Sequence, residues 1–241
     1  MRGMAGDRST YQPVQTPVFT SAEPADIARV LVERFGCEIG YVADLDAIAG
    51  AEPDWSSMSA LRSAGLALRA DIGLRNIDQA ARLANRTWLD GHDTHELVEG
   101  VIAGLETVPS ADALAEMLVT VGASRLIFSL DLHAGEPMTR SPAWRDFEIE
   151  QVLRTAYEVG VRRFIVLDVA RVGSGQGTGT EPICRRLRAI SNDIEMVAGG
   201  GVRGASDLDR LRRSGCQAAL VASALYDGVL SVADVERITR S

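Results

Sequence analysis

Acidic residues end four of the seven apolar runs that indicate β-strands in this sequence, and Glu106 follows a fifth run by two residues. Carboxyl groups that converge in one site raise one another's proton affinity, which suits general acid–base catalysis near neutral pH. They also suit a hard divalent cation or a cationic substrate group, and the alternative is that some only cap helices or pair with arginines. The predicted catalytic residues are Asp131, Asp44 and Asp168. The other residues expected in the same site are Asp46, Asp71, Glu106 and Arg171.

Glycine-rich turns supply the second set of candidate groups, because they let backbone N–H groups approach an anion closely. Three consecutive glycines lie in Val197–Arg203, and small residues recur in Val172–Glu181 and Val221–Gly228. Since the chain contains no lysine, we expect backbone amides to bind the phosphate. The alternative is a tight turn that binds nothing. The predicted phosphate site consists of Gly177, Gly200, Gly201, Ala222 and Ser223.

The composition excludes several classes of function. All 25 basic residues are arginines, which excludes Schiff-base chemistry on lysine and a Walker-type phosphate loop. Three histidines and three separated cysteines give little material for a triad, a zinc cluster or a disulfide framework. The net charge of −8 argues against a nucleic-acid partner, and no apolar run reaches the length of a membrane span. We therefore expect a cytoplasmic protein without cofactor or metal, whose partner is a small phosphorylated metabolite; a homo-oligomer is compatible with the sequence.

The elements that must position these groups alternate between strand and helix. The predicted strands are Ile39–Asp44, Leu66–Asp71, Gly100–Gly104, Arg125–Asp131, Arg163–Asp168, Glu195–Gly199 and Ala218–Ala222. The predicted helices are Ala25–Phe35, Trp55–Ala64, Ile77–Leu83, Ala111–Thr120, Phe147–Val159, Glu181–Ser191, Ala205–Ser214 and Val232–Thr239. Such alternation predicts a parallel sheet, and the number of units favours a (β/α)₈ TIM barrel over a doubly wound sheet. In a parallel barrel the carboxyl ends of all strands share one mouth.

An internal repeat predicts a barrel that consists of two half-barrels. Ala70–Ala80 resembles Ala198–Leu208, and Tyr41–Ala47 resembles Ile165–Arg171, in both cases at an offset of about half the chain. The first half supplies one strand fewer than the second. The first strand of the barrel is therefore expected to be missing or irregular.

This gap shapes the expected domain. We expect one barrel domain over residues 1–241, with an irregular segment at 1–24 and a loop insertion at 85–96. We expect the missing strand to be encoded upstream of Met1, with Met1–Gly6 as its tail. Each unpaired buried N–H or C=O group costs about 1–3 kcal/mol. The alternatives are therefore closure by the N-terminal segment itself or by another chain.

Five segments together resemble a known family. YVADLDAI, FSLDL, VLDVARVGSGQGTG, AGGGVR and VASALYDG resemble the barrels of histidine biosynthesis, ProFAR isomerase and the cyclase subunit of imidazole glycerol phosphate synthase, over Ile39 to Gly228. The match is nearest to a divergent, ProFAR-isomerase-related branch. The resemblance implies a barrel of two half-barrels, a phosphosugar substrate and an Amadori-type aldose–ketose rearrangement by two aspartates. It places one aspartate at Asp131 and supports the predicted phosphate site, but the strand-one aspartate has no counterpart.

The sequence also departs from the family pattern. Asp71 replaces a glycine in the turn after one strand, and Glu106 follows the next strand. Acids there would repel a second phosphate, which argues against the family's bis-phosphate substrate. The favoured function is an isomerase-like enzyme acting on a phosphorylated small molecule. The alternatives are a carboxylate-lined synthase or lyase in cofactor biosynthesis of the one-carbon or methanopterin type, metal-assisted or not, and a non-catalytic protein that binds a phosphorylated ligand.

Overall fold

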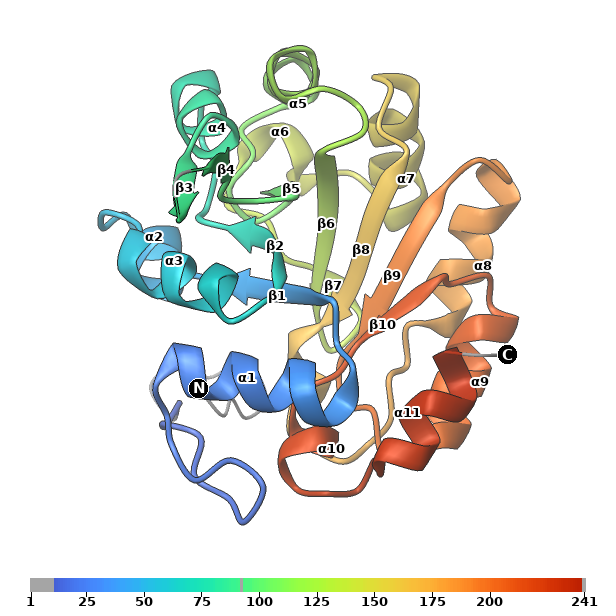
Figure 1. Ribbon diagram of the computed structural model, residues 1–241. Coiled ribbons are helices and arrows are strands. Elements are labelled where there is room, and N and C mark those ends of the chain that lie inside the picture. Colours follow the sequence, from blue (N-terminus) through green and yellow to red (C-terminus); the bar gives the residue numbers. More distant parts are fainter. Residues whose placement is uncertain (1–10, 92, 240–241) are drawn as a thin grey trace.

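The parallel sheet expected from the alternating pattern is present and nearly closes into a barrel (Figure 1). The computed structural model describes residues 11–91 and 93–239. The strands of the main sheet, in spatial order, are β1 (Ile39–Ala43), β2 (Ala67–Asp71), β5 (Gly100–Gly104), β6 (Leu126–His133), β8 (Arg163–Asp168), β9 (Glu195–Gly199) and β10 (Ala218–Leu220). All neighbours along this path are parallel, so the predicted α/β class and TIM-barrel architecture are confirmed.

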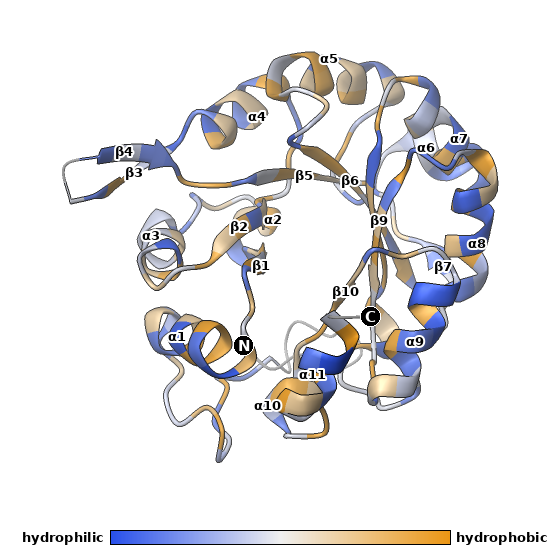
Figure 2. Ribbon diagram, turned by 45° about the vertical axis from the view of Figure 1, so that its right-hand side comes forward, coloured by the Kyte–Doolittle hydropathy of each residue, from blue (hydrophilic) through white to orange (hydrophobic). Residues whose placement is uncertain are grey.

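Helices surround the barrel on its outer side (Figure 2). The longer ones are α1 (Pro24–Phe35), α3 (Trp55–Ser63), α4 (Ile77–Ala84), α5 (Ala111–Val121), α7 (Ile149–Glu158), α8 (Glu181–Ile190), α9 (Ala205–Arg213) and α11 (Val232–Thr239). Several of them begin at a residue whose side chain accepts a hydrogen bond from a backbone N–H of the first turn, as Asn76 does for α4 and Ser110 for α5. Within the described residues, no helix combines the length and apolar character needed to cross a membrane.

Short elements complete the connections between strands and helices. They are α2 (Leu45–Ala49), β7 (Glu136–Pro137), α6 (Pro142–Arg145), a 3₁₀ turn (Val169–Arg171) and α10 (Ser223–Tyr226). All of them follow the carboxyl ends of barrel strands. They therefore belong to the loops that surround the mouth.

The apolar core has two layers, one on each side of the sheet. Strand β6 shows the reason, because its residues alternate between the helices and the barrel interior. Phe128 packs in the outer layer between sheet and helices, whereas Ile127 packs inside the barrel with Ile102, Ile165 and Val197. A strand buried on both faces needs apolar residues at consecutive positions, which explains the continuous apolar runs in the sequence.

Ion pairs close the amino-terminal end of the barrel, opposite the mouth. Arg163 lies 3.0 Å from both Glu99 and Glu195, and Arg69 lies 2.9 Å from Glu99 and 3.3 Å from Glu195. Burial raises the pKa of Glu99, but hydrogen bonds and charge from the two arginines outweigh it and lower that pKa overall. This end is filled by paired charges, so chemistry is left to the carboxyl ends of the strands.

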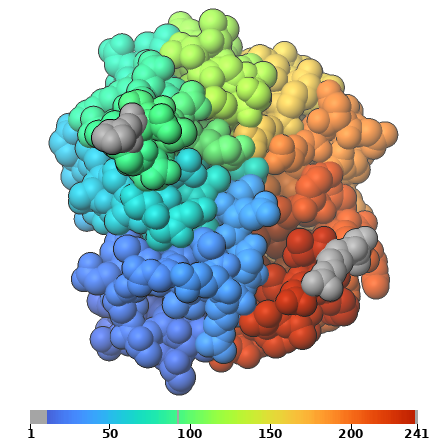
Figure 3. All heavy atoms as spheres, viewed as in Figure 1, coloured from blue at the N-terminus to red at the C-terminus, as the bar shows by residue number. Residues whose placement is uncertain are grey.

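The sequence predicts a missing or irregular strand between β1 and β10. The described residues contain no strand that pairs with either of these two edges. The irregular segment 11–23 instead packs Val14 and Phe19 into an apolar cluster with residues such as Phe35 and Leu225. Helices α1 and α11 contact each other, and the first and last parts of the chain lie side by side (Figure 3). Met1–Gly6, the predicted tail of the missing strand, lies outside the described residues.

The stretch 85–96, predicted as an inserted loop, contains regular structure of its own. Strands β3 (Thr87–Asp90) and β4 (Asp93–Glu96) form an antiparallel hairpin that is separate from the barrel sheet and extends away from it (Figure 2). Trp88 anchors the hairpin, since the Arg62 guanidinium lies 5.3 Å from its ring centroid. Leu89 points outward and is 70% exposed.

Candidate functional site

Asp71 and Asp131 lie opposite each other in the mouth, on either side of Gly104. Strand β5, which ends at Gly104, runs between β2 and β6, which carry the two aspartates. A Cβ atom added to Gly104 would lie 3.4 Å from Oδ2 of Asp131 and 3.5 Å from Oδ2 of Asp71. Both residues are buried: Asp131 is 8% exposed and Asp71 is 6% exposed. The two carboxylates thus approach the same position of the mouth, the one that a side chain at residue 104 would occupy.

The second oxygen of each of these carboxylates is held by a neighbour on its own strand or turn. Oδ1 of Asp131 accepts a hydrogen bond from the Ser129 hydroxyl at 2.9 Å, and Oδ1 of Asp71 accepts one from the Gly73 N–H at 2.8 Å. Ser129 is fully buried and was not predicted as a site residue. The available signal was its position two residues before Asp131, because residues two apart face the same side of a strand.

Asp168 ends β8, but its carboxylate is occupied by backbone donors. Its Oδ1 accepts from the N–H groups of Ala134 and Ala170, both at 3.1 Å, and its Oδ2 accepts from Gly135 at 3.0 Å. Arg171 lies 3.6 Å from the same Oδ2. This carboxylate therefore ties the loop after β6 to the turn after β8.

Asp44 is engaged in a similar way on the other side of the mouth. Its Oδ1 accepts from the Ala47 N–H at 3.0 Å, which caps α2, and its Oδ2 accepts from the Asp54 N–H at 2.8 Å. Asp46 lies in the first turn of α2 and is exposed. No atom of Asp44 or Asp46 lies within 4 Å of the Gly104 position at which Asp71 and Asp131 converge.

Two of the predicted phosphate-binding glycines, Gly200 and Gly201, pack against the end of β8 and the turn after it, and Gly201 also packs against Gly177. A Cβ on Gly201 would lie 2.5 Å from the Arg171 carbonyl oxygen and 3.0 Å from that of Gly177. A Cβ on Gly200 would lie 2.5 Å from the Asp168 carbonyl oxygen. All three glycines have positive φ angles, between 69° and 97°, which residues with a Cβ rarely adopt. Conformation therefore favours glycine at all three positions, and the lack of space excludes a side chain at Gly200 and Gly201.

Ala222 and Ser223 emerge at the same edge of the sheet as these glycines. Strand β10 pairs with β9 so that Leu220 faces Gly199, and the chain leaves the sheet on both strands directly after this pair. Ser223 is the first residue of the short helix α10. The register therefore puts both ends of the predicted phosphate site at the mouth.

Glu106 lies at the rim of the mouth and pairs with an arginine. Arg140 Nη2 donates to its Oε1 at 2.6 Å, and the Glu106 side chain is 12% exposed. The two residues line a cavity of about 280 Å³ together with Arg75. Arg75 donates to the carbonyl oxygens of Gly73 and Ile48. The acid at this rim is thus balanced by positive charge, which the sequence did not indicate.

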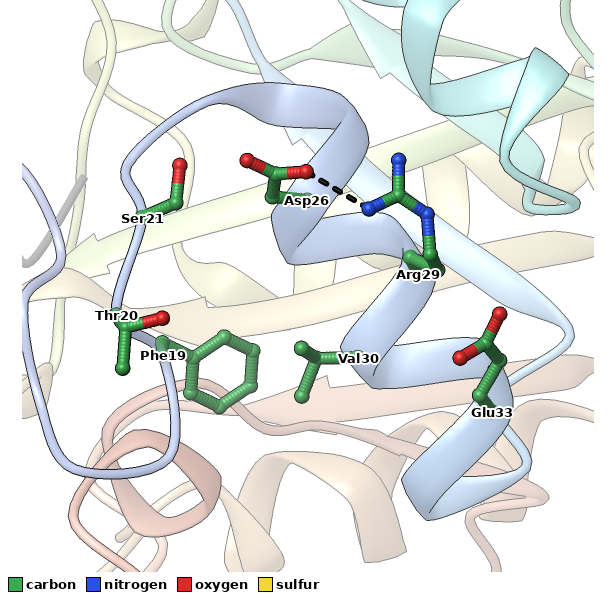
Figure 4. A pocket seen from close by; sticks show the side chains of 7 residues that line it. All are labelled: Phe19, Thr20, Ser21, Asp26, Arg29, Val30 and Glu33. Carbon is green, nitrogen blue, oxygen red and sulfur yellow. Dashed lines mark hydrogen bonds and ion pairs between the residues drawn. The ribbon is translucent and has the colours of Figure 1, made fainter.

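A cavity of about 330 Å³ lies away from the mouth, between the segment before α1 and α1 itself (Figure 4). Phe19 and Val30 form its apolar side, and Asp26 and Arg29 form an ion pair at 2.8 Å beside it. No predicted site residue lines this cavity. Among the described residues, no group of three or more His, Cys, Asp and Glu side chains is arranged to hold a metal ion.

Relatives of this chain are similar to it over most of its length. A 1-(5-phosphoribosyl)-5-((5-phosphoribosylamino)methylideneamino)imidazole-4-carboxamide isomerase of Rubrobacter xylanophilus is 30% identical over 215 residues, which cover 86% of this chain and 80% of the relative. A protein of the same name from Cenarchaeum symbiosum is 27% identical over 235 residues, 96% of this chain and 90% of the relative. An uncharacterized protein of Methanocaldococcus jannaschii is 24% identical over 235 residues, 98% of this chain and 91% of the relative.

A family model covers almost the whole chain. The model described as histidine biosynthesis protein matches residues 6–231, which include every predicted site residue. This agrees with the resemblance of the strand-end motifs and with the nearly closed parallel barrel. The chain belongs to the histidine biosynthesis protein family.

Proposed function

We propose that this chain is an isomerase-like enzyme that acts on a phosphorylated small molecule, with Asp131 and Asp71 as its acid–base pair. The observation that carries the proposal is the convergence of these two buried carboxylates across Gly104. The isomerase names of the relatives support the reaction class. The glycine cradle at Gly177, Gly200 and Gly201 supports a phosphate group as the anchor of the substrate.

The proposed reaction is an Amadori-type rearrangement of an aminoaldose. One carboxylic acid donates a proton to the ring oxygen as the bond between C1 and that oxygen breaks, and the nitrogen lone pair forms a C1=N bond. The other carboxylate removes the proton from C2, and the resulting enolamine tautomerises to the aminoketose. Each such proton transfer contributes roughly 10² to 10⁴ in rate. Two carboxylates that reach one point from opposite sides suit two successive transfers on neighbouring substrate atoms.

Asp168 and Asp44, predicted as catalytic residues, take a supporting role in this proposal. Their carboxylate oxygens accept hydrogen bonds from backbone N–H groups of the loops at the mouth. We propose that they hold these loops in place, and that Asp71 supplies the second acid–base group instead.

The test is turnover by the purified chain of ProFAR and of singly phosphorylated aminoaldoses. Asp131→Asn and Asp71→Asn should each lower kcat by about 10² or more, whereas the exposed control Asp46→Asn should leave it unchanged. Full activity of Asp71→Asn would overturn its assignment. An absence of turnover by a parent chain that still binds phosphate would favour a non-catalytic binding protein.

A synthase or lyase in cofactor biosynthesis is the second candidate. The observation that favours it is the rim formed by Glu106, Arg140 and Arg75, beside the turn in which Asp71 replaces a glycine of the family pattern. A rim of paired charges suits a substrate whose far end differs from a second phosphate. Turnover of a singly phosphorylated substrate with formation or cleavage of a carbon–carbon or carbon–nitrogen bond would support this candidate over isomerisation.

A further inference from the structure

Arg203, the last residue of the AGGGVR motif, lies on the proposed phosphate cradle. A Cβ on Gly177 would lie 3.0 Å from its Nη2, 3.1 Å from its Cζ and 3.2 Å from its Nε. Three guanidinium atoms at nearly equal distances indicate that the guanidinium plane lies flat over Gly177. Gly177 in turn contacts the turn at Gly201. The side chain of Arg203 is therefore part of the same surface as the two glycines.

A buried carboxylate fixes the orientation of Arg203. Its Nε donates to Oδ2 of Asp207 at 3.0 Å and its Nη2 donates to Oδ1 at 3.1 Å. The Arg203 backbone N–H also donates to Oδ2 at 3.0 Å. Asp207 is fully buried, and Arg210 donates to it as well. A two-point pair of this kind holds a guanidinium in one plane, which a single contact does not.

This arrangement leaves one edge of the guanidinium available. None of the described residues accepts a hydrogen bond from Nη1 of Arg203, and the side chain is 48% exposed. Arg171, the other arginine at the cradle, differs because its Nη1 donates to the carbonyl oxygens of Gln176 and Gly177. The cradle glycines contribute only neutral N–H groups. Nη1 of Arg203 therefore keeps donors that none of the described residues uses.

We propose that Arg203 is a binding residue for the substrate phosphate, with Nη1 donating to a phosphate oxygen while Asp207 holds the opposite edge. This inference rests on the proposed function, because it needs a phosphate in the cradle. Asp207 is a positioning residue in this proposal, since it acts only through Arg203. Gly177 then has a second purpose, because any side chain at position 177 would displace the guanidinium.

The test measures the affinity of the folded chain for inorganic phosphate by isothermal titration calorimetry, with folding checked by thermal melting. Removal of one charge-assisted hydrogen bond should weaken binding by about tenfold or more, so Arg203→Met is expected to show that loss. Arg203→Lys keeps the charge without the fork and should recover part of it. Arg210→Met is the matched control. It also removes a donor to Asp207, but it leaves Arg203, the side chain beside Gly177, in place. It should change the affinity less than threefold.

The outcomes separate this inference from the proposed function. If the parent chain binds phosphate and Gly201→Asp abolishes binding, the cradle stands. Equal affinity of Arg203→Met and the parent would then overturn the role of Arg203 alone. Equal losses in Arg203→Met and Arg210→Met would also overturn it, because they would indicate a general structural effect. Asp207→Asn should weaken phosphate binding in the parent but not in Arg203→Met. No phosphate binding by the parent would overturn the cradle and the inference together.

Discussion

The ring of Phe19 meets the ring of Tyr226 edge to face, with centroids 4.8 Å apart and planes at 78°. The two residues come from opposite ends of the chain, and Phe19 also stacks on Phe35 of α1 at 6.3 Å. Both Phe19 and Phe35 are buried. This contact joins the irregular N-terminal segment to α10, the short helix that follows β10.

Truncation of Phe19 should therefore destabilise the fold. Phe19→Ala is expected to lower the free energy of unfolding by about 3–5 kcal/mol, because it removes a buried ring and leaves a cavity. Urea denaturation followed by circular dichroism measures this. Thr20→Ala, at the exposed neighbouring position, should change the value by less than about 0.5 kcal/mol. Similar stabilities of the two variants would show that the N-terminal segment is not part of the folded core.

Loss of Arg163 should weaken the amino-terminal end of the barrel. Arg163→Met leaves Glu99 and Glu195 with Arg69 as their only partner in the ion-pair cluster. Because the two glutamates stay partly exposed, the expected loss is about 1–3 kcal/mol rather than the full cost of a buried charge. Arg82→Met, which removes an exposed pair with Glu52, should cost less than about 1 kcal/mol. Equal effects on the melting temperature would contradict the distinction.

Gly200 should tolerate no side chain, whereas Gly204 in the same turn should. Gly200→Ala combines a positive φ of 97° with a Cβ that would lie 2.5 Å from the Asp168 carbonyl oxygen. We expect the free energy of unfolding to decrease by about 1–3 kcal/mol and phosphate binding to weaken. A Cβ on Gly204 meets no atom within 4 Å. Gly204→Ala should therefore melt within a few degrees of the parent.

Acid should destabilise the region around Asp207. Burial raises the pKa of Asp207, but hydrogen bonds from Arg203 and Arg210 outweigh it and hold that pKa below the ordinary value of 3.8. A lowered folded-state pKa means that the stabilisation is complete above about pH 4 and is lost as the pH falls through the folded-state pKa. The unfolding free energy of the parent should therefore decrease below about pH 4 more steeply than that of Asp207→Asn. Parallel pH profiles between pH 2 and 5 would refute this role for the ionised carboxylate.

The sequence by itself determined the barrel, its strand order along the chain and the acids at its strand ends. All seven predicted strands and eight predicted helices occur, with boundaries shifted by a few residues. This success has a local cause, because an apolar run such as Arg163–Asp168 and the amphipathic pattern of Ile77–Ala84 depend on short stretches of chain. The hairpin at Thr87–Glu96 escaped prediction because its residues are mostly exposed and polar, so burial left no pattern in them.

The tertiary structure decided which of these acids face one another. Asp168 and Asp71 both end apolar strands, yet Asp168 meets the N–H groups of Ala134 and Gly135 from a distant loop, and Asp71 meets Asp131 across Gly104. Arg203 likewise reaches Gly177 only because the loop after β8 folds over the turn after β9. A carboxylate or guanidinium takes the partners that other segments bring within about 3 Å. That proximity arises from the closure of the barrel, which no local stretch of sequence specifies.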